Sequence, residues 1–242
     1  MDGGSTRRPP DMKLVFGGGL WPLGWSVGFV ERPLSETYAR YRAWGLGAAF
    51  NELGRLPIVD ALHQLLPFEM PYTRRLLVGT SGRWTAIFDN SRGGGDPWPP
   101  TSYLARDDAH GVVATHIPPE QSSLPATQFH LLGPEGEAPL MYVRTIDAGV
   151  FDSGRWEFET WGTTQLFEDV DAYKTRRIRD RFTRAMLLEY LGALGIEADE
   201  PDFYREAVLV QDTTRRWTLR RDRWRASLEQ ARRECLGAVS VS

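Results

Sequence analysis

The chain has 242 residues, of which 41% are hydrophobic and 25% are charged, and its formal net charge is -3. This composition excludes a disordered chain, because disordered segments combine low hydrophobicity with high net charge. The mild negative charge also argues against a protein that coats nucleic acid over its whole surface, although a local basic face stays possible.

A single cysteine, Cys235, excludes an intramolecular disulfide and a cysteine-based metal site. Stability must then come from the core, which fits a reducing cytoplasm. No apolar run reaches the roughly 18 residues that span a bilayer, and the first residues lack the apolar stretch of a secretory signal. We expect a cytoplasmic protein without membrane contact, with a flexible lead at 1–12 and one domain at 13–242.

The first third of the chain predicts one strand and two helices. Residues 13–33 combine apolar residues with glycines, which indicates a loop and an edge strand. The apolar spacing of residues 34–56 predicts a helix with Ser35 as its N-cap, weakened by two internal glycines. Residues 57–67 predict a short amphipathic helix that begins and ends at proline.

A region rich in strand signals follows. Residues 73–90 predict two strands joined by a hairpin at 80–82. Residues 99–108 predict one or two helical turns, and residues 110–119 predict a short strand that prolines end. Several strands are expected between 127 and 167.

Residues 156–161 show the period-2 pattern of a half-buried antiparallel strand. Trp156 and Phe158 alternate with Glu157 and Glu159. If the two aromatic side chains face the core, both carboxylates face water. We therefore interpret this carboxylate pair as a solvated face rather than as acid–base machinery.

The last third predicts two long helices around a short strand. Residues 169–195 have a charged first half and an apolar second half, and Gly195 is a natural stop. Residues 205–212 predict a strand, and the helical spacing from Trp217 through Trp224 to Cys235 predicts an amphipathic helix. The predicted fold class is α+β, with a central, mostly antiparallel sheet and flanking helices in a single domain.

The stretch from Asp89 to Trp98 is the main candidate site. Its acidic and amide side chains can group oxygen ligands for a hard cation around three glycines. The spacing matches neither an EF-hand nor a P-loop, and a wide turn capped by its own side chains explains the same pattern. We predict no metal and no cofactor, and the candidate binding residues are Asp89, Asn90, Asp96 and Trp98.

No catalytic set stands out among the usual nucleophiles and bases. The four histidines lack HExxH spacing, and no GxSxG elbow is present. Either His116 or His130 on a strand face can act as a base, although structural histidines are the simpler interpretation. Cys235 is expected to be buried and inert. The enzymatic alternative is a hydrolase that combines the Asp89, Asn90 and Asp96 loop with a histidine.

Two segments are rich in arginine. Residues 174–184 carry six basic residues against Asp180, and residues 215–233 carry eight arginines. Arginines with interleaved Trp217 and Trp224 can bind phosphates and stack bases. If the tryptophans belong to the core, the arginines form only a solvated face. Nucleic-acid binding through these two predicted helices is the second alternative.

Two further stretches carry a resemblance when taken together. WTAIFDN with GGGDP (84–97) and LFEDVDAYKTRRIRDRFTRAMLLEYLGALGIEADEPDFY (166–204) resemble uncharacterised bacterial proteins from GC-rich genomes, met among toxin–immunity gene neighbours. Only two of the 29 basic residues are lysines, as GC-rich codon usage produces. The resemblance implies a cytoplasmic α+β protein that binds another protein, and it transfers no functional residues.

The function expected from these observations is that of a non-enzymatic protein-binding protein, an immunity-like inhibitor of a toxin. Its mild acidity suits a basic nuclease toxin through electrostatic steering. Trp98 beside the glycine-rich loop is the expected anchor of the contact.

Overall fold

The computed structural model describes residues 13–44, 48–70, 74–138, 140–212 and 224–237. The predicted lead at 1–12 lies outside this range. In chain order the strands are β1 (Ser26–Val30), β2 (Ala48–Arg55), β3 (Phe68–Met70), β4 (Arg74–Thr80), β5 (Thr85–Asp89), β6 (Gly111–Ile117), β7 (Ala126–Glu137), β8 (Tyr142–Val150), β9 (Trp156–Gly162), β10 (Tyr204–Asp212) and β11 (Trp224–Ala226).

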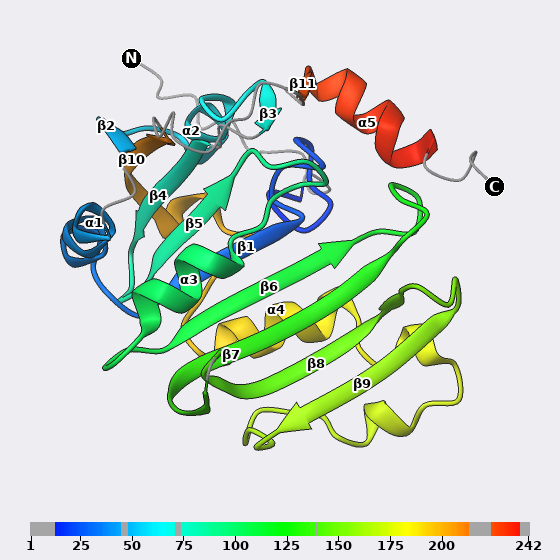
Figure 1. Cartoon of the computed structure of the whole chain (residues 1–242). Helices are drawn as coiled ribbons and strands as arrows, with labels where there is room; N and C mark the ends of the chain where they lie inside the picture. Colours follow the sequence, from blue (N-terminus) through cyan, green and yellow to red (C-terminus); the bar gives the residue numbers. More distant parts are fainter. Residues whose placement is uncertain (1–12, 45–47, 71–73, 139, 213–223, 238–242) are drawn as a thin grey trace, which may run out of the picture.

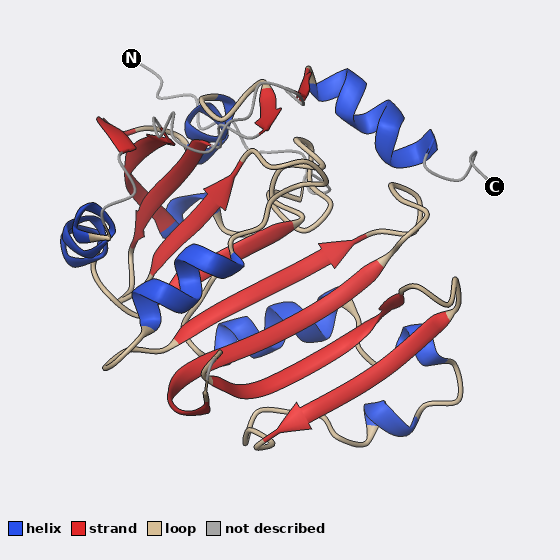
Figure 2. Ribbon diagram, in the orientation of Figure 1, coloured by secondary structure: helices blue, strands red, loops and turns tan. Residues whose placement is uncertain are grey.

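Nine of these strands form one antiparallel sheet in the order β2-β10-β4-β5-β1-β6-β7-β8-β9, and β11 pairs with β3. Figures 1 and 2 show this sheet as the centre of the molecule, with helices on both of its faces. The predicted single α+β domain with flanking helices is therefore confirmed. The helices are α1 (Leu34–Ala43), α2 (Ile58–His63), α3 (Trp98–Ala105), α4 (Arg184–Ala193) and α5 (Leu228–Gly237), with 3-10 turns η1 (Ala172–Lys174), η2 (Ile178–Asp180) and η3 (Pro201–Phe203).

The two faces of the sheet carry cores of different size. On one face, α4 and α2 pack with the segment 13–25 in the larger core, which includes Phe129, Ile146 and Tyr190. On the other face, α1 and α3 cover a smaller core that includes Tyr41 and Leu104. In Figure 1, α3 lies in front of β1 and β6, and α4 lies behind the sheet. The front of β8 and β9 carries no described helix.

The prediction of an edge strand within 13–33 is wrong, because β1 lies in the middle of the sheet between β5 and β6. Its apolar side chains reach both cores, because successive side chains of a strand point to opposite faces of the sheet. A Cβ on Gly28 would lie 2.1 Å from Oγ1 of Thr101, so the glycine lets α3 sit directly on β1.

The predicted helix over 34–56 is wrong in its second half. The helix ends at Ala43, and β2 follows from Ala48. Ser35 is not its N-cap, since Pro33 holds that position. Phe50 of β2 packs edge-on against Tyr38 and Tyr41 of α1. Tertiary contact between the two elements therefore replaces the continuous helix.

The predicted helix over 169–195 is also wrong in its first half, where the chain forms the short turns η1 and η2. The carboxylate of Asp169 accepts hydrogen bonds from the backbone N–H groups of Asp171 and Ala172, which is the pattern of an N-cap, but only the short 3-10 turn η1 follows it. Helix α4 begins after the N-cap Thr183. It stops at Gly195, which has a positive φ of 77°, as predicted.

The last predicted helix is shorter than its apolar spacing suggested. Trp224 lies in β11, and α5 starts only at Leu228, while Trp217 lies outside the described residues. A capping box sets the start: Ser227 Oγ accepts from the N–H of Gln230, and Gln230 Oε1 accepts from the N–H of Ser227.

Candidate functional site

Asp89 holds the shape of the glycine-rich loop. Its side chain is 2% exposed. One carboxylate oxygen accepts from the N–H of Ser91 and the other from the N–H of Asp96, each at 2.8 Å. Both oxygens therefore serve the backbone of the loop.

Asn90 is equally structural. It is fully buried, its side-chain oxygen accepts from the N–H of Arg74 at 2.7 Å, and its amide donates to the carbonyl of Pro67 at 3.0 Å. The glycines beside it have positive φ angles, and a Cβ on Gly94 would lie 2.2 Å from the carbonyl oxygen of Pro22. This geometry favours the interpretation as a capped turn.

Asp96 is the exposed acid of the loop. Partial burial and the charge of Asp89 together raise the pKa of its carboxyl group. Across the described part of the chain, no group of three or more acidic, histidine or cysteine side chains is placed to hold a metal ion. The structure thus brings Asp89 and Asp96 together without a third ligand.

Trp98 packs onto the sheet, against side chains of β7 and β8. Its indole N–H donates to Nδ1 of His130 at 3.2 Å. Nε2 of His130 lies 2.8 Å from Oδ1 of Asp147, which also accepts from the Gln128 amide at 2.7 Å. Since Nδ1 accepts, the proton of the neutral ring is on Nε2 and is donated to Asp147.

The His130–Asp147 pair has the composition of a catalytic dyad, yet it lacks a free base. A general base needs an unoccupied nitrogen within reach of the proton that it removes. Here one nitrogen faces the indole of Trp98 and the other faces the carboxylate. The arrangement positions side chains on the sheet rather than activating a nucleophile.

These residues belong to a larger surface, which we call the open face. Cross-strand partners share one face of a sheet. His130 pairs with Thr145 and then with Trp161, while Gln128 pairs with Asp147 and then with Glu159. In the other direction, His130 pairs with Val113 of β6, and Val113 pairs with Gly28 of β1, which lies beneath α3. The open face consists of Gln128, His130, Tyr142, Thr145, Asp147, Glu157, Glu159 and Trp161.

The open face is acidic and aromatic. Trp161 is 45% exposed, and its ring packs edge-on against Tyr142, which in turn meets Trp98. Asp147, Glu157 and Glu159 supply three carboxylates. The only lysine or arginine within β7, β8 and β9 is Arg144, which pairs with Leu131 and so points to the opposite face. The predicted outward orientation of Glu157 and Glu159 is confirmed by this register.

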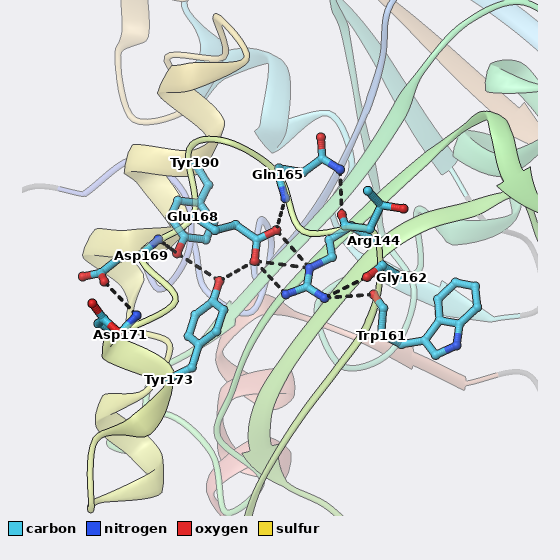
Figure 3. Close-up of polar contacts among 10 residues, drawn as sticks. Arg144, Trp161, Gly162, Gln165, Glu168, Asp169, Asp171, Tyr173 and Tyr190 are labelled. Atoms are coloured by element: carbon cyan, nitrogen blue, oxygen red, sulfur yellow. Dashed lines mark hydrogen bonds and ion pairs between the residues drawn. The ribbon is translucent and has the colours of Figure 1, made fainter.

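A second polar cluster lies on that opposite face (Figure 3). The side chains of Arg144 and Glu168 are 5% and 0% exposed, and they are joined at 2.7 Å. Glu168 also accepts from Tyr173, whose hydroxyl meets that of Tyr190. Arg144 further donates to the carbonyl of Trp161. With its donors and acceptors paired, this cluster fastens the segment after β9 to the sheet.

The remaining histidines are dispersed. His63 is exposed on α2. His110 bridges carboxylates of Glu31 and Glu135 at 2.7 and 3.0 Å. His116 faces the α4 side, where Nδ1 lies 2.9 Å from the hydroxyl of Thr127. None of the three joins the acids of the loop.

Other predicted features are placed as follows. Cys235 is half-buried on α5, and burial together with Glu234 raises the pKa of its thiol. A raised thiol pKa means little thiolate at neutral pH, in keeping with the predicted inert role. Trp224 is half-buried, with its ring 6.4 Å from that of Phe68. Within the described residues, no helix is long and apolar enough to cross a membrane.

Sequence reasoning missed Asp147, Tyr142 and Trp161 as members of a common surface. The signal was present in the alternation of β9, but the registers that align β9 with β8 and β7 are tertiary information. Comparison with known proteins adds no guide, since no protein-family model, curated protein or solved structure matches the chain.

Proposed function

We propose that the protein is a non-enzymatic binding protein that docks a basic partner protein on the open face. The observation that carries the proposal is the uncovered half of the sheet. Helices α1 and α3 cover the first strands on this side, but no described helix covers β8 and β9 (Figure 1). A sheet surface that no helix covers and that presents the partly exposed ring of Trp161 is a candidate interaction site.

Charge selects the kind of partner. The carboxylates of Asp147, Glu157 and Glu159 lie on one surface, and β7–β9 place no lysine or arginine beside them. A partner surface rich in arginine or lysine is complementary to such a face, and the long-range attraction would speed association. The immunity-like inhibitor of a basic toxin is the specific form of this proposal.

Aromatic residues give the contact its expected energetic centre. Trp161 is partly exposed and is backed by Tyr142, with Trp98 behind it. Tryptophan and tyrosine are enriched among the few residues that carry most of the binding energy at protein interfaces. Trp98, the anchor expected from the sequence, thus acts as the support of Trp161 rather than as the most exposed ring.

A second copy of the chain fits the same surface poorly. Strand β9 is an edge of the sheet. An antiparallel pairing of β9 with its copy, centred on Phe158, would set Glu157 of each chain opposite Glu159 of the other. Like charges on an edge strand discourage this association.

The hydrolase alternative receives no support from the geometry. The side-chain oxygens of Asp89 and Asn90 accept hydrogen bonds from backbone N–H groups. Among the described residues, no histidine forms a hydrogen bond with Asp96. The groove at Trp156 and the pocket between Arg55 and Tyr204 are lined by none of these acids and by neither His116 nor His130.

Affinity purification of the tagged protein from its native host tests the proposal. The double variant Glu157→Gln/Glu159→Gln should lose the basic partner that the wild-type chain retains, and the wild-type complex should weaken with salt. Glu52→Gln/Glu206→Gln is the matched control, because it removes the same charge from exposed positions of β2 and β10, at the far end of the sheet.

Retention of one stoichiometric basic protein by the wild type and the control, with its loss from the open-face variant, supports the proposal. Absence of any such protein, or equal retention by all three chains, contradicts it.

A further inference from the structure

On the opposite side of β9, we infer that a shallow groove binds single-stranded nucleic acid. The groove has a volume of about 410 Å³ and is lined by Trp156, Arg177, Ile178 and Arg179. Trp156 pairs with Val150 and shares the face of Phe158, so it points away from the open face. This site is independent of the partner proposed above.

The two arginines of the groove have free donors. Both approach one carboxylate, Asp180, at 3.8 and 3.7 Å, which is beyond hydrogen-bonding distance. Among the described residues, neither guanidinium group donates a hydrogen bond. Their side chains are 63% and 53% exposed. Each guanidinium can therefore offer its fork of N–H groups to a phosphate.

Other basic side chains surround the groove. Arg176 is exposed, and Arg181 stacks its guanidinium over the ring of Phe158 at 5.7 Å. Asp180 is the acid shared by the lining arginines, whereas Lys174 is paired with Asp171. The local charge is therefore positive, although the whole chain is slightly acidic.

The half-buried indole of Trp156 favours a nucleotide over an acidic peptide as the anionic ligand of the groove. Acidic peptides need only the arginines, whereas a nucleotide also offers a flat base for stacking on the indole. The groove is open along the surface, so a chain can pass through it. Phosphates on Arg177 and Arg179 with a base on Trp156 use all three side chains, and the turn η2 holds the arginines beside β9.

Fluorescence anisotropy with a labelled oligothymidine of roughly 12 nucleotides tests the inference, because base stacking tolerates any sequence. Arg177→Gln/Arg179→Gln should weaken binding at least roughly tenfold and lower the dependence of log K on log salt by about 1.4 for two lost phosphate contacts. Trp156→Leu should weaken binding and leave the salt dependence unchanged. Arg55→Gln/Arg106→Gln is the control with equal charge loss at exposed positions outside both arginine-rich segments.

Three outcomes would overturn the inference: no binding of the oligothymidine by the wild type, equal loss in the groove variant and the control, or equal binding of an oligoglutamate of the same length. Melting curves of each variant exclude unfolding as the cause. Because the open-face carboxylates are intact in every variant, the capture experiment above can succeed or fail independently.

Discussion

The indole of Trp98 and the imidazole of His130 are joined by a hydrogen bond of 3.2 Å that connects the first turn of α3 to β7. The contact fixes the border between the covered and uncovered halves of the sheet. Beyond it, Tyr142 and Trp161 continue outward in edge-on ring contacts. The support of the open face is therefore built into the fold before any partner binds.

Replacing Trp98 by phenylalanine separates the polar from the apolar part of this contact. Trp98→Phe should lower the free energy of unfolding by about 1 kcal/mol, the usual net value of one hydrogen bond, because the ring can still pack on Tyr142. Trp98→Ala should cost more, since the packing is also lost. Urea denaturation measures both. Equal values for the two variants would show that the packing of the ring contributes nothing, and an unchanged value for Trp98→Phe would show that the hydrogen bond contributes nothing.

The glycine-rich loop gives a contrast between two acids. Asp89→Ala should lower the free energy of unfolding by about 2–4 kcal/mol, because two backbone N–H groups lose a charged acceptor in a buried position. Asp96→Ala should change it by less than about 0.5 kcal/mol, as expected for an exposed side chain. If the two variants melt alike, the carboxylate of Asp89 does not hold the loop.

The ion pair of Arg144 and Glu168 should behave as a buried unit. Glu168→Leu should destabilise by about 3–5 kcal/mol, because it leaves the guanidinium buried without its partner. The double variant Arg144→Met/Glu168→Leu should recover much of this loss, since both charges are gone. A double-mutant cycle measures the coupling, and strictly additive effects would contradict it.

Stability at acid pH should depend on His116. Burial, with Arg184 and then Lys13, lowers the pKa of its imidazole in the folded protein from 6.5 to about 4. The unfolded chain therefore binds more protons as the pH falls below about 6.5, and the free energy of unfolding decreases, by up to about 3 kcal/mol near pH 4. In the His116→Gln variant the free energy of unfolding should decrease less between pH 6.5 and pH 4 than in the wild type. Parallel pH profiles would show that His116 does not contribute.

Short strands and hairpins were predictable because their signals are local. The hairpin of β4 and β5, the prolines around α2 and the stop of α4 at Gly195 follow from neighbouring residues. The predictions of long helices were wrong where capping side chains and tertiary contacts had more influence on the backbone than the apolar spacing. Asp169 and Ser227 end or start elements at points that spacing alone cannot identify.

The candidate site shows the same division. The sequence identifies the loop from Asp89 to Asp96 as either a capped turn or a ligand site. An acid that caps the backbone has the same spacing as one that binds a ligand, so only the burial and the hydrogen bonds of the side chains distinguish the two interpretations. The open face depends on strand registers between β7, β8 and β9, which bring Asp147 beside Glu159. No local pattern contains that pairing.

The affinity of the Trp161→Ala variant for the captured partner protein tests docking on the open face most directly. Isothermal titration at fixed salt should show at least roughly tenfold weaker binding, or about 1.4 kcal/mol, because an exposed tryptophan at an interface centre carries much of the binding energy. Val59→Ala is the control, since Val59 is 40% exposed on α2 outside the open face. If Trp161→Ala binds the partner as tightly as the Val59→Ala control does, the partner does not dock on the open face.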